Sequence, residues 1–320
     1  MLPEVTHNYF NVNGIRLHVA SAGRPDGVPV VLCHGFPELW YSWRHQIEPL
    51  AAAGYHVLVP DMRGYGESSS PPEIEAYTHE IICNDLIALL DELGYAQAIF
   101  IGHDWGGAIV WSLAAHFPDR VRAVAGINTP HAPAPRSNPF ELLKRRPGRY
   151  AYQVYFQEPG VAEAELERDF ERTFQLAIRS SRDTGPSNPI YRTHLALEAG
   201  AFLPDDAEYT PSDLLTEADV AYYAEQYRRN GFRGPLNWYR NMEANWQWAR
   251  KTDGQISVPA LMVTVGRDPV LPASMSKDME KYVPDLKRGH IEECGHWTMQ
   301  EKPTELNQIL IDWLTQVVSA

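Results

Sequence analysis

The stretch Gly102-His103-Asp104-Trp105-Gly106-Gly107 decides the fold of this chain. An apolar run, Ala98 to Ile101, comes before it and a helical pattern, Ala108 to Phe117, comes after it. The sequence therefore predicts a strand, a sharp turn and a helix. Glycines on both sides suit such a turn, because bulkier side chains would clash where the chain reverses. The residue lifted above the sheet is then Asp104.

A carboxylate at the tip of this turn indicates a particular kind of nucleophile. Serine takes that place in the G-x-S-x-G turn of esterases and lipases, and this chain has no such pattern. An ionised aspartate suits carbon electrophiles such as epoxides or alkyl halides, on which it forms an ester that water later cleaves. In a purely structural alternative, Asp104 only caps the following helix.

Length and composition favour a globular protein. The 320 residues suffice for one large domain or for a core with an insert. The net charge of −13 comes from 41 acidic and 28 basic residues without long blocks of one sign, so we expect no nucleic-acid binding. Three cysteines without C-x-x-C spacing favour a reducing compartment over disulfides or a zinc site. Without an export signal or a long apolar run, we expect a cytoplasmic location and no membrane span.

Strand and helix signals alternate through the first 130 residues. Such alternation predicts an α/β fold with a mostly parallel sheet covered by helices. From about Asn128 the pattern changes to prolines and tyrosine-rich helices, and strand signals resume at about Val258. We predict a core of residues 1–130 and 253–320 with an inserted helical lid at 131–252. The predicted strands are 28–32, 55–60, 98–101, 121–127, 259–265 and 286–291, and the predicted core helices are 77–93, 108–117 and 303–318.

Three turns follow predicted strands at their carboxyl ends, where open α/β sheets place ligands. They are His34–Pro37, Asp61–Gly66 and the Asp104 turn. A turn of this kind predicts its partners in chain order, first an acid after a later core strand and then a histidine near the C-terminus. Asp268 and His296 fit that order, although an aspartate in Gly-x-Asp-Pro is by itself more often a turn residue.

The roles of these residues follow from their chemistry. Asp104 needs no base, since a carboxyl with an ordinary pKa of about 4 is ionised at neutral pH. We expect neutral His296 to deprotonate the water that attacks the ester, while Asp268 fixes the ring tautomer and stabilises the imidazolium. The backbone N–H groups of Phe36 and Trp105 would stabilise the tetrahedral intermediate, each by about 3 kcal/mol. A cis bond to the proline after Phe36 would aim that N–H, but most such bonds are trans.

Six longer segments carry a resemblance to a known family: His34–Glu38, Gly64–Ser69, Gly102–Gly107, Tyr155–Gly160, Gly231–Arg240 and Gly289–Trp297. In them the chain resembles the α/β-hydrolase-fold epoxide hydrolases, most of all the C-terminal hydrolase domain of the mammalian soluble enzymes. That resemblance runs through nearly the whole sequence. The mammalian proteins also carry an N-terminal phosphatase domain. This chain begins almost at the hydrolase core, so we do not expect that domain's activity or any dimerisation that depends on it.

The resemblance implies two tyrosines in the lid, which fall on Tyr152 and Tyr239. A neutral phenol stabilises and protonates the alkoxide that leaves when an epoxide opens. Tyr155 is close enough to Tyr152 to be an alternative, so Tyr239 is the firmer assignment. The expected reactants are a small hydrophobic epoxide and water, with no cofactor. We expect no metal either, since no H-E-x-x-H or similar spacing occurs.

Two other functions remain open at this point. A haloalkane dehalogenase shares the fold, the aspartate, the histidine and a tryptophan after the nucleophile. Its halide leaves without a proton, so Tyr152 and Tyr239 favour the epoxide. A non-catalytic ligand-binding protein would need neither nucleophile nor base, which Asp104 and His296 supply. His34 and His103 are expected to be hydrogen-bonding scaffold, and the oligomeric state stays open.

Overall fold

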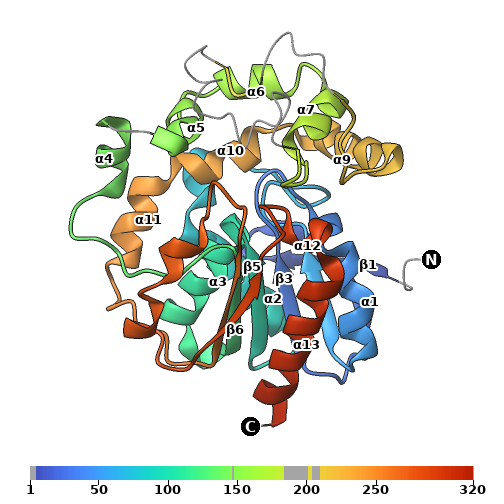
Figure 1. Ribbon diagram of the computed structural model, residues 1–320, viewed down its shortest axis with the longest axis vertical. Helices are drawn as coiled ribbons and strands as arrows, with labels where there is room; N and C mark the ends of the chain where they lie inside the picture. The colour runs from blue at the N-terminus through green and yellow to red at the C-terminus, as the bar shows by residue number, and fades with distance from the viewer. Residues whose placement is uncertain (1–4, 146–147, 184–200, 204–209, 320) are drawn as a thin grey trace.

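A single sheet of eight strands forms the centre of the computed structural model (Figure 1). The structure describes residues 5–145, 148–183, 201–203 and 210–319. Within them the strand order is β1-β2-β4-β3-β5-β6-β7-β8; β2 runs antiparallel to β1 and β4, and the remaining pairs are parallel. The strands are β1 (Thr6–Val12), β2 (Ile15–Gly23), β3 (Pro29–Cys33), β4 (His56–Pro60), β5 (Ala98–His103), β6 (Val121–Ile127), β7 (Ala260–Val265) and β8 (Leu286–Ile291).

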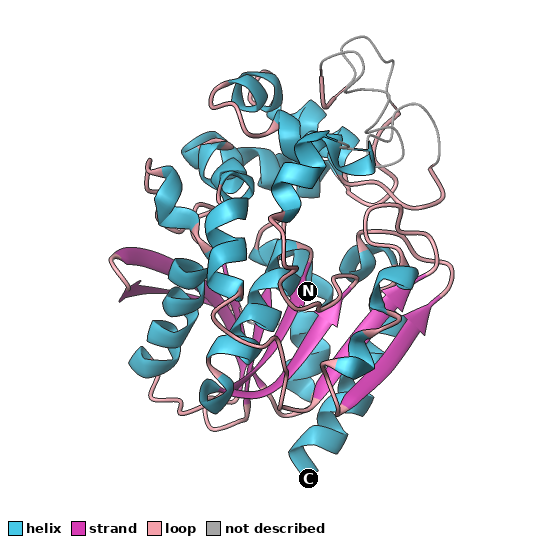
Figure 2. Ribbon diagram, turned by 90° about the vertical axis from the view of Figure 1, so that its left-hand side faces the viewer, coloured by secondary structure: helices cyan, strands magenta, loops and turns pink. Residues whose placement is uncertain are grey.

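Helices cover both faces of this sheet (Figures 1 and 2). Side chains of β3 alternate between two apolar clusters, with Val31 in one and Val30 in the other. The first cluster includes residues of α2 (His79–Glu92) and α3 (Trp105–His116), and the second includes residues of α1 (Arg44–Ala52) and α13 (Pro303–Ser319). Because a strand turns successive side chains to opposite faces, an apolar run without polar interruptions is what a two-sided core requires. The predicted α/β class and mostly parallel sheet are confirmed.

The first two strands were not among those predicted. β1 is mostly exposed at the edge of the sheet, so its sequence, Thr6 to Val12, mixes polar and apolar residues. Asn13 and Gly14 join it to β2 with positive φ angles of 45° and 78°. Asn-Gly between two extended segments is a strong signal for a two-residue hairpin turn, because these residues tolerate that backbone conformation. This signal could have found the hairpin.

A group of helices lies between β6 and β7 in the sequence and arches over one end of the sheet (Figure 1). It covers the carboxyl end of β5, since α10 and the residue after β5 line one cavity. The predicted boundaries of a lid at 131–252 stay a prediction. The helices are α4 (Pro139–Arg145), α5 (Ala151–Tyr155), α6 (Val161–Leu166), α7 (Phe170–Ala177), α9 (Glu217–Asn230), α10 (Arg233–Arg240) and α11 (Met242–Ala249). In the described part of the chain, no helix has the length and apolar character needed to cross a membrane.

Candidate active site

Asp104 stands between the end of β5 and the start of α3, at the predicted sharp turn. Its backbone has φ 50° and ψ −120°, a conformation that a non-glycine residue rarely adopts. A Cβ atom on Gly102 would collide with the Gly106 carbonyl, and one on Gly106 would collide with the Cys33 carbonyl. The two glycines therefore allow strand and helix to approach closely enough for this turn.

The backbone N–H of Phe36 points at the Asp104 carboxylate. It donates to Asp104 Oδ1 at 2.9 Å, from the loop after β3, and the Phe36–Pro37 peptide is cis. Trp105 is the first residue of α3, so its N–H is among those that a helix N-terminus leaves without a partner inside the helix. The Phe36 donor thus lies against the Asp104 carboxylate, and the Trp105 donor belongs to the next residue along the chain. Their role in stabilising an oxyanion stays a prediction.

His296 lies between two carboxylates. Its Nδ1 is 2.8 Å from Asp268 Oδ2, and its Nε2 is 3.9 Å from Asp104 Oδ2. Asp268 Oδ1 also accepts from the backbone N–H groups of Val270 and Leu271, at 2.8 and 3.0 Å. Although burial opposes the charge, His296 and these donors hold the pKa of Asp268 well below its ordinary value. The structure thus brings together the acid, histidine and nucleophile that the sequence proposed.

The surroundings of His296 favour its charged form in the unreacted protein. Burial lowers its pKa, but the negative charge and hydrogen bond of Asp268, with the charge of Asp104, outweigh burial and raise the pKa to about 9. At neutral pH the resting ring is therefore an imidazolium. The neutral base expected from the sequence requires the loss of one of the two negative charges.

Tyr152 of α5 and Tyr239 of α10 share one cavity with Asp104. Tyr152, Tyr239, Asp104, His296 and Phe36 all line it, and the two phenol rings lie 5.9 Å apart. Burial first, and then the charge of Asp104, raises the pKa of the Tyr152 phenol well above its ordinary value. Burial, followed by Tyr152 and Asp104, does the same for Tyr239. Both phenols therefore keep their protons at neutral pH. Among the described residues, the rest of the lining is apolar: Pro37, Ala177, Phe202, Val270 and Trp297.

Tyr155, the alternative to Tyr152, is directed elsewhere. Its hydroxyl donates to Glu165 at 2.6 Å, and it is not among the residues of the cavity. The geometry therefore favours Tyr152 as the partner of Tyr239.

Sequence reasoning missed Asn128, which follows β6 with a positive φ of 62°. Its amide donates to Asp268 Oδ2 at 2.8 Å, and its carbonyl oxygen accepts from the Thr298 hydroxyl at 2.7 Å. Asn128 thus positions Asp268, which in turn positions His296. Its place at the carboxyl end of a core strand was the available signal.

The two histidines beside the site are hydrogen-bonding scaffold, as expected. His103 Nδ1 is 2.8 Å from Glu38 Oε2, and its Nε2 is 2.8 Å from the carbonyl oxygen of His296. His34 Nε2 accepts from the backbone N–H of Met62 at 3.0 Å. Glu38 was not singled out from the sequence, because nothing local shows that it meets His103.

Comparison with known proteins agrees with this arrangement. A family described as alpha/beta hydrolase fold matches residues 28–303. "Epoxide hydrolase A" of Mycobacterium tuberculosis is 41% identical over 97% of this chain and 97% of its own length. "Bifunctional epoxide hydrolase 2" of Mus musculus is 53% identical over 97% of this chain, which spans 56% of that relative. The crystal structure of epoxide hydrolase A from Mycobacterium thermoresistibile superposes with a TM-score of 0.84 at 40% identity, over 97% of this chain and 98% of that one. The chain belongs to the α/β-hydrolase-fold family and, within it, to the epoxide hydrolases.

Proposed function

We propose that this protein hydrolyses epoxides to vicinal diols through a covalent ester on Asp104. One observation carries the proposal: a carboxylate, a histidine and two buried phenols line the same cavity. A carboxylate and a histidine alone would also suffice to displace a halide ion from an alkyl halide. Two protonated phenols have a use only where the leaving oxygen needs a proton.

The first step is attack on an epoxide carbon. Phe36 holds Asp104 Oδ1 by its N–H, so Oδ2 is the oxygen that attacks. As the carbon–oxygen bond breaks, Tyr152 and Tyr239 donate hydrogen bonds to the developing alkoxide, and one of them gives up its proton. This proton transfer is downhill, because a phenol is a far stronger acid than an alcohol.

The second step is hydrolysis of the ester. Ester formation removes the charge of Asp104, one of the two charges that raise the pKa of His296. The imidazolium then gives up its proton and the phenolate takes one up, which restores the phenol and leaves His296 neutral. Neutral His296 deprotonates a water that attacks the ester carbonyl, while Phe36 and Trp105 donate to the oxyanion. Asp268 stabilises the imidazolium that forms again. The oxyanion then collapses, the bond between the carbonyl carbon and the substrate oxygen breaks, and the departing alkoxide takes the proton of the newly formed carboxyl group. This releases the diol and restores the Asp104 carboxylate.

A comparison of two substrates tests the function. The protein is incubated with styrene oxide and, separately, with a chloroalkane, and diol and chloride are measured. We expect diol from the epoxide and no chloride. Chloride release without diol would instead identify a dehalogenase. In this proposal residues 131–252 act as the lid, because this segment contains both Tyr152 and Tyr239.

A further inference from the structure

The turn at residues 61–66 follows β4 and is one of the three turns that the sequence marks as functional. Its residues are not among the described ones that line the active-site cavity. The turn nevertheless contacts α10, the helix that carries Tyr239. The indole N–H of Trp238, the residue before Tyr239, donates to the carbonyl oxygen of Arg63 at 3.1 Å. The turn therefore reaches the active site through the helix that bears one of its phenols.

Two glycines bring the turn and α10 into backbone contact. A Cβ atom on Gly234 of α10 would lie 2.9 Å from both the Cα atom and the carbonyl oxygen of Gly64, closer than van der Waals contact allows. Gly64 has a φ angle of 91°, a conformation that favours glycine. The ring of Tyr65 packs edge-on against Trp238, with centroids 5.6 Å apart. This close contact leaves α10 little room to shift against the turn.

The turn itself is held by a buried ion pair. The Arg63 guanidinium donates to both carboxylate oxygens of Asp85 on α2, at 2.7 and 2.6 Å, and both side chains are buried. Arg63 also donates to the carbonyl oxygen of Asn13 at 3.2 Å. Such a bidentate pair fixes the arginine in one geometry. The carbonyl oxygen that accepts from Trp238 is therefore anchored to α2 and to the first hairpin of the core.

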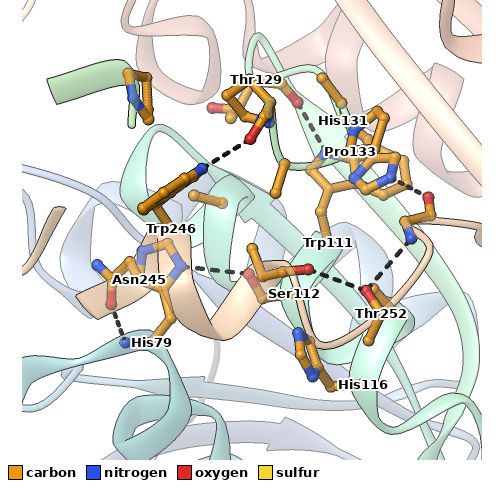
Figure 3. A pocket seen from close by; sticks show the side chains of 18 of the residues that line it. His79, Trp111, Ser112, His116, Thr129, His131, Pro133, Asn245, Trp246 and Thr252 are labelled. Carbon is orange, nitrogen blue, oxygen red and sulfur yellow. Dashed lines mark hydrogen bonds between the residues drawn. The ribbon is translucent and has the colours of Figure 1, made fainter. Parts of the chain in front are cut away.

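The chain beyond Tyr239 is attached to the core as well. The Asn241 amide donates to the carbonyl oxygen of Ile74 at 2.6 Å. Asn245 of α11 follows one turn later, and its Oδ1 accepts from the backbone N–H of His79 at 2.8 Å. Figure 3 shows this bond beside a cavity that both residues line. Tyr239 thus lies between two attachments to the core, one before it and one after it.

We propose that the turn at residues 61–66 acts through Trp238 and Gly234 to position the Tyr239 phenol for proton transfer. Both are positioning residues, since neither is among the described residues that line the active-site cavity. A phenol protonates the leaving oxygen only within hydrogen-bond reach, so a displacement of about 1 Å slows that step. This inference rests on the proposed function and adds to it residues outside the cavity.

Two substitutions change the contact between the turn and α10 in different ways. Trp238→Phe removes the N–H and keeps an apolar ring. Gly234→Ala suits a helix, but its Cβ atom would press against Gly64. Each is added to His296→Gln, in which the ester should accumulate because its hydrolysis needs the imidazole ring.

The rate of ester formation, followed by intact-mass spectrometry, should fall about tenfold with Trp238→Phe and at least as much with Gly234→Ala. Trp40→Phe is the matched control and should leave the rate nearly unchanged. It also removes the N–H of a buried tryptophan, which there joins the core to the Tyr222 hydroxyl of α9 at 2.8 Å. When Tyr239→Phe is present as well, neither Trp238→Phe nor Gly234→Ala should slow ester formation further, since both act through that phenol. No loss with either substitution, or an equal loss with and without Tyr239→Phe, would overturn the inference.

A measurement without substrate separates this inference from the proposed function. Fluorotyrosine placed at position 239 gives a fluorine NMR signal that reports the surroundings of that ring. We expect Gly234→Ala, which neither adds nor removes a ring, to shift or split this signal, and Trp40→Phe to leave it unchanged. If the signal responds in this way but no epoxide reacts, the positioning holds and the proposed function fails. A signal that Gly234→Ala leaves unchanged contradicts the positioning, whatever the protein hydrolyses.

Discussion

Replacing His296 by glutamine should stop the reaction halfway. The ring nitrogen that faces Asp104 lies 3.9 Å from Oδ2, so it makes no hydrogen bond to that carboxylate. Phe36 still donates to Oδ1 at 2.9 Å, and both phenols remain. Attack on the epoxide should therefore continue. Hydrolysis should slow by about 10²–10⁴-fold, the usual contribution of a general base.

The trapped state gives this prediction a direct assay. Mixing His296→Gln with excess epoxide should consume one equivalent in a burst, followed by very slow diol release. Intact-mass spectrometry should then show an adduct of the substrate's mass, which maps to the peptide that contains Asp104. Asp104→Ala, the control, should show neither burst nor adduct. Diol release by His296→Gln at close to the normal rate would refute the role of the histidine.

Further predictions concern the phenols, the acid, the turn and pH. Tyr239→Phe should slow the burst by about 10²–10⁴-fold, and the double change with Tyr152→Phe should abolish it while circular dichroism stays normal. Asn128→Gly, which suits the positive φ of 62° there, should slow steady diol release about tenfold but leave the burst unchanged, since the hydrogen bonds lost are those to Asp268 and Thr298 and not any to Asp104. Gly35→Ala, added to His296→Gln, should suppress adduct formation in mass spectrometry, because its Cβ would overlap the Asp104 side chain. The pKa of His296 rises on folding from 6.5 to about 9. Its ion pair with Asp268 therefore stabilises the fold fully below pH 6.5, and this stabilisation is lost as the pH rises through 9. Urea unfolding should show that decline, worth about 3 kcal/mol, in the normal protein and not in His296→Gln.

The sequence was sufficient for features that depend on local patterns. The apolar strands and the glycines around Asp104 predicted both the sheet and the sharp turn, because each needs particular residue types at fixed spacing. The order of Asp268 and His296 placed them at neighbouring strand ends. The two tyrosines came from family resemblance, since 16 tyrosines offer no local signal that would select two of them.

Features that arise from tertiary contact could not be predicted in this way. The Glu38–His103 pair joins residues 65 positions apart, and the support of Asp268 by Asn128 joins residues 140 positions apart. The charge of His296 depends on the distances to two carboxylates, which only the folded chain defines.

A single turnover in heavy-oxygen water tests the covalent route most directly. Enzyme in excess over epoxide is allowed to react once, and the diol and the Asp104 peptide are analysed by mass spectrometry. If Asp104 is the nucleophile, the oxygen added to the first diol comes from its carboxylate, and the solvent label appears in Asp104. Solvent label in the first diol, with none in Asp104, would mean that water attacks the epoxide directly and would contradict the covalent mechanism.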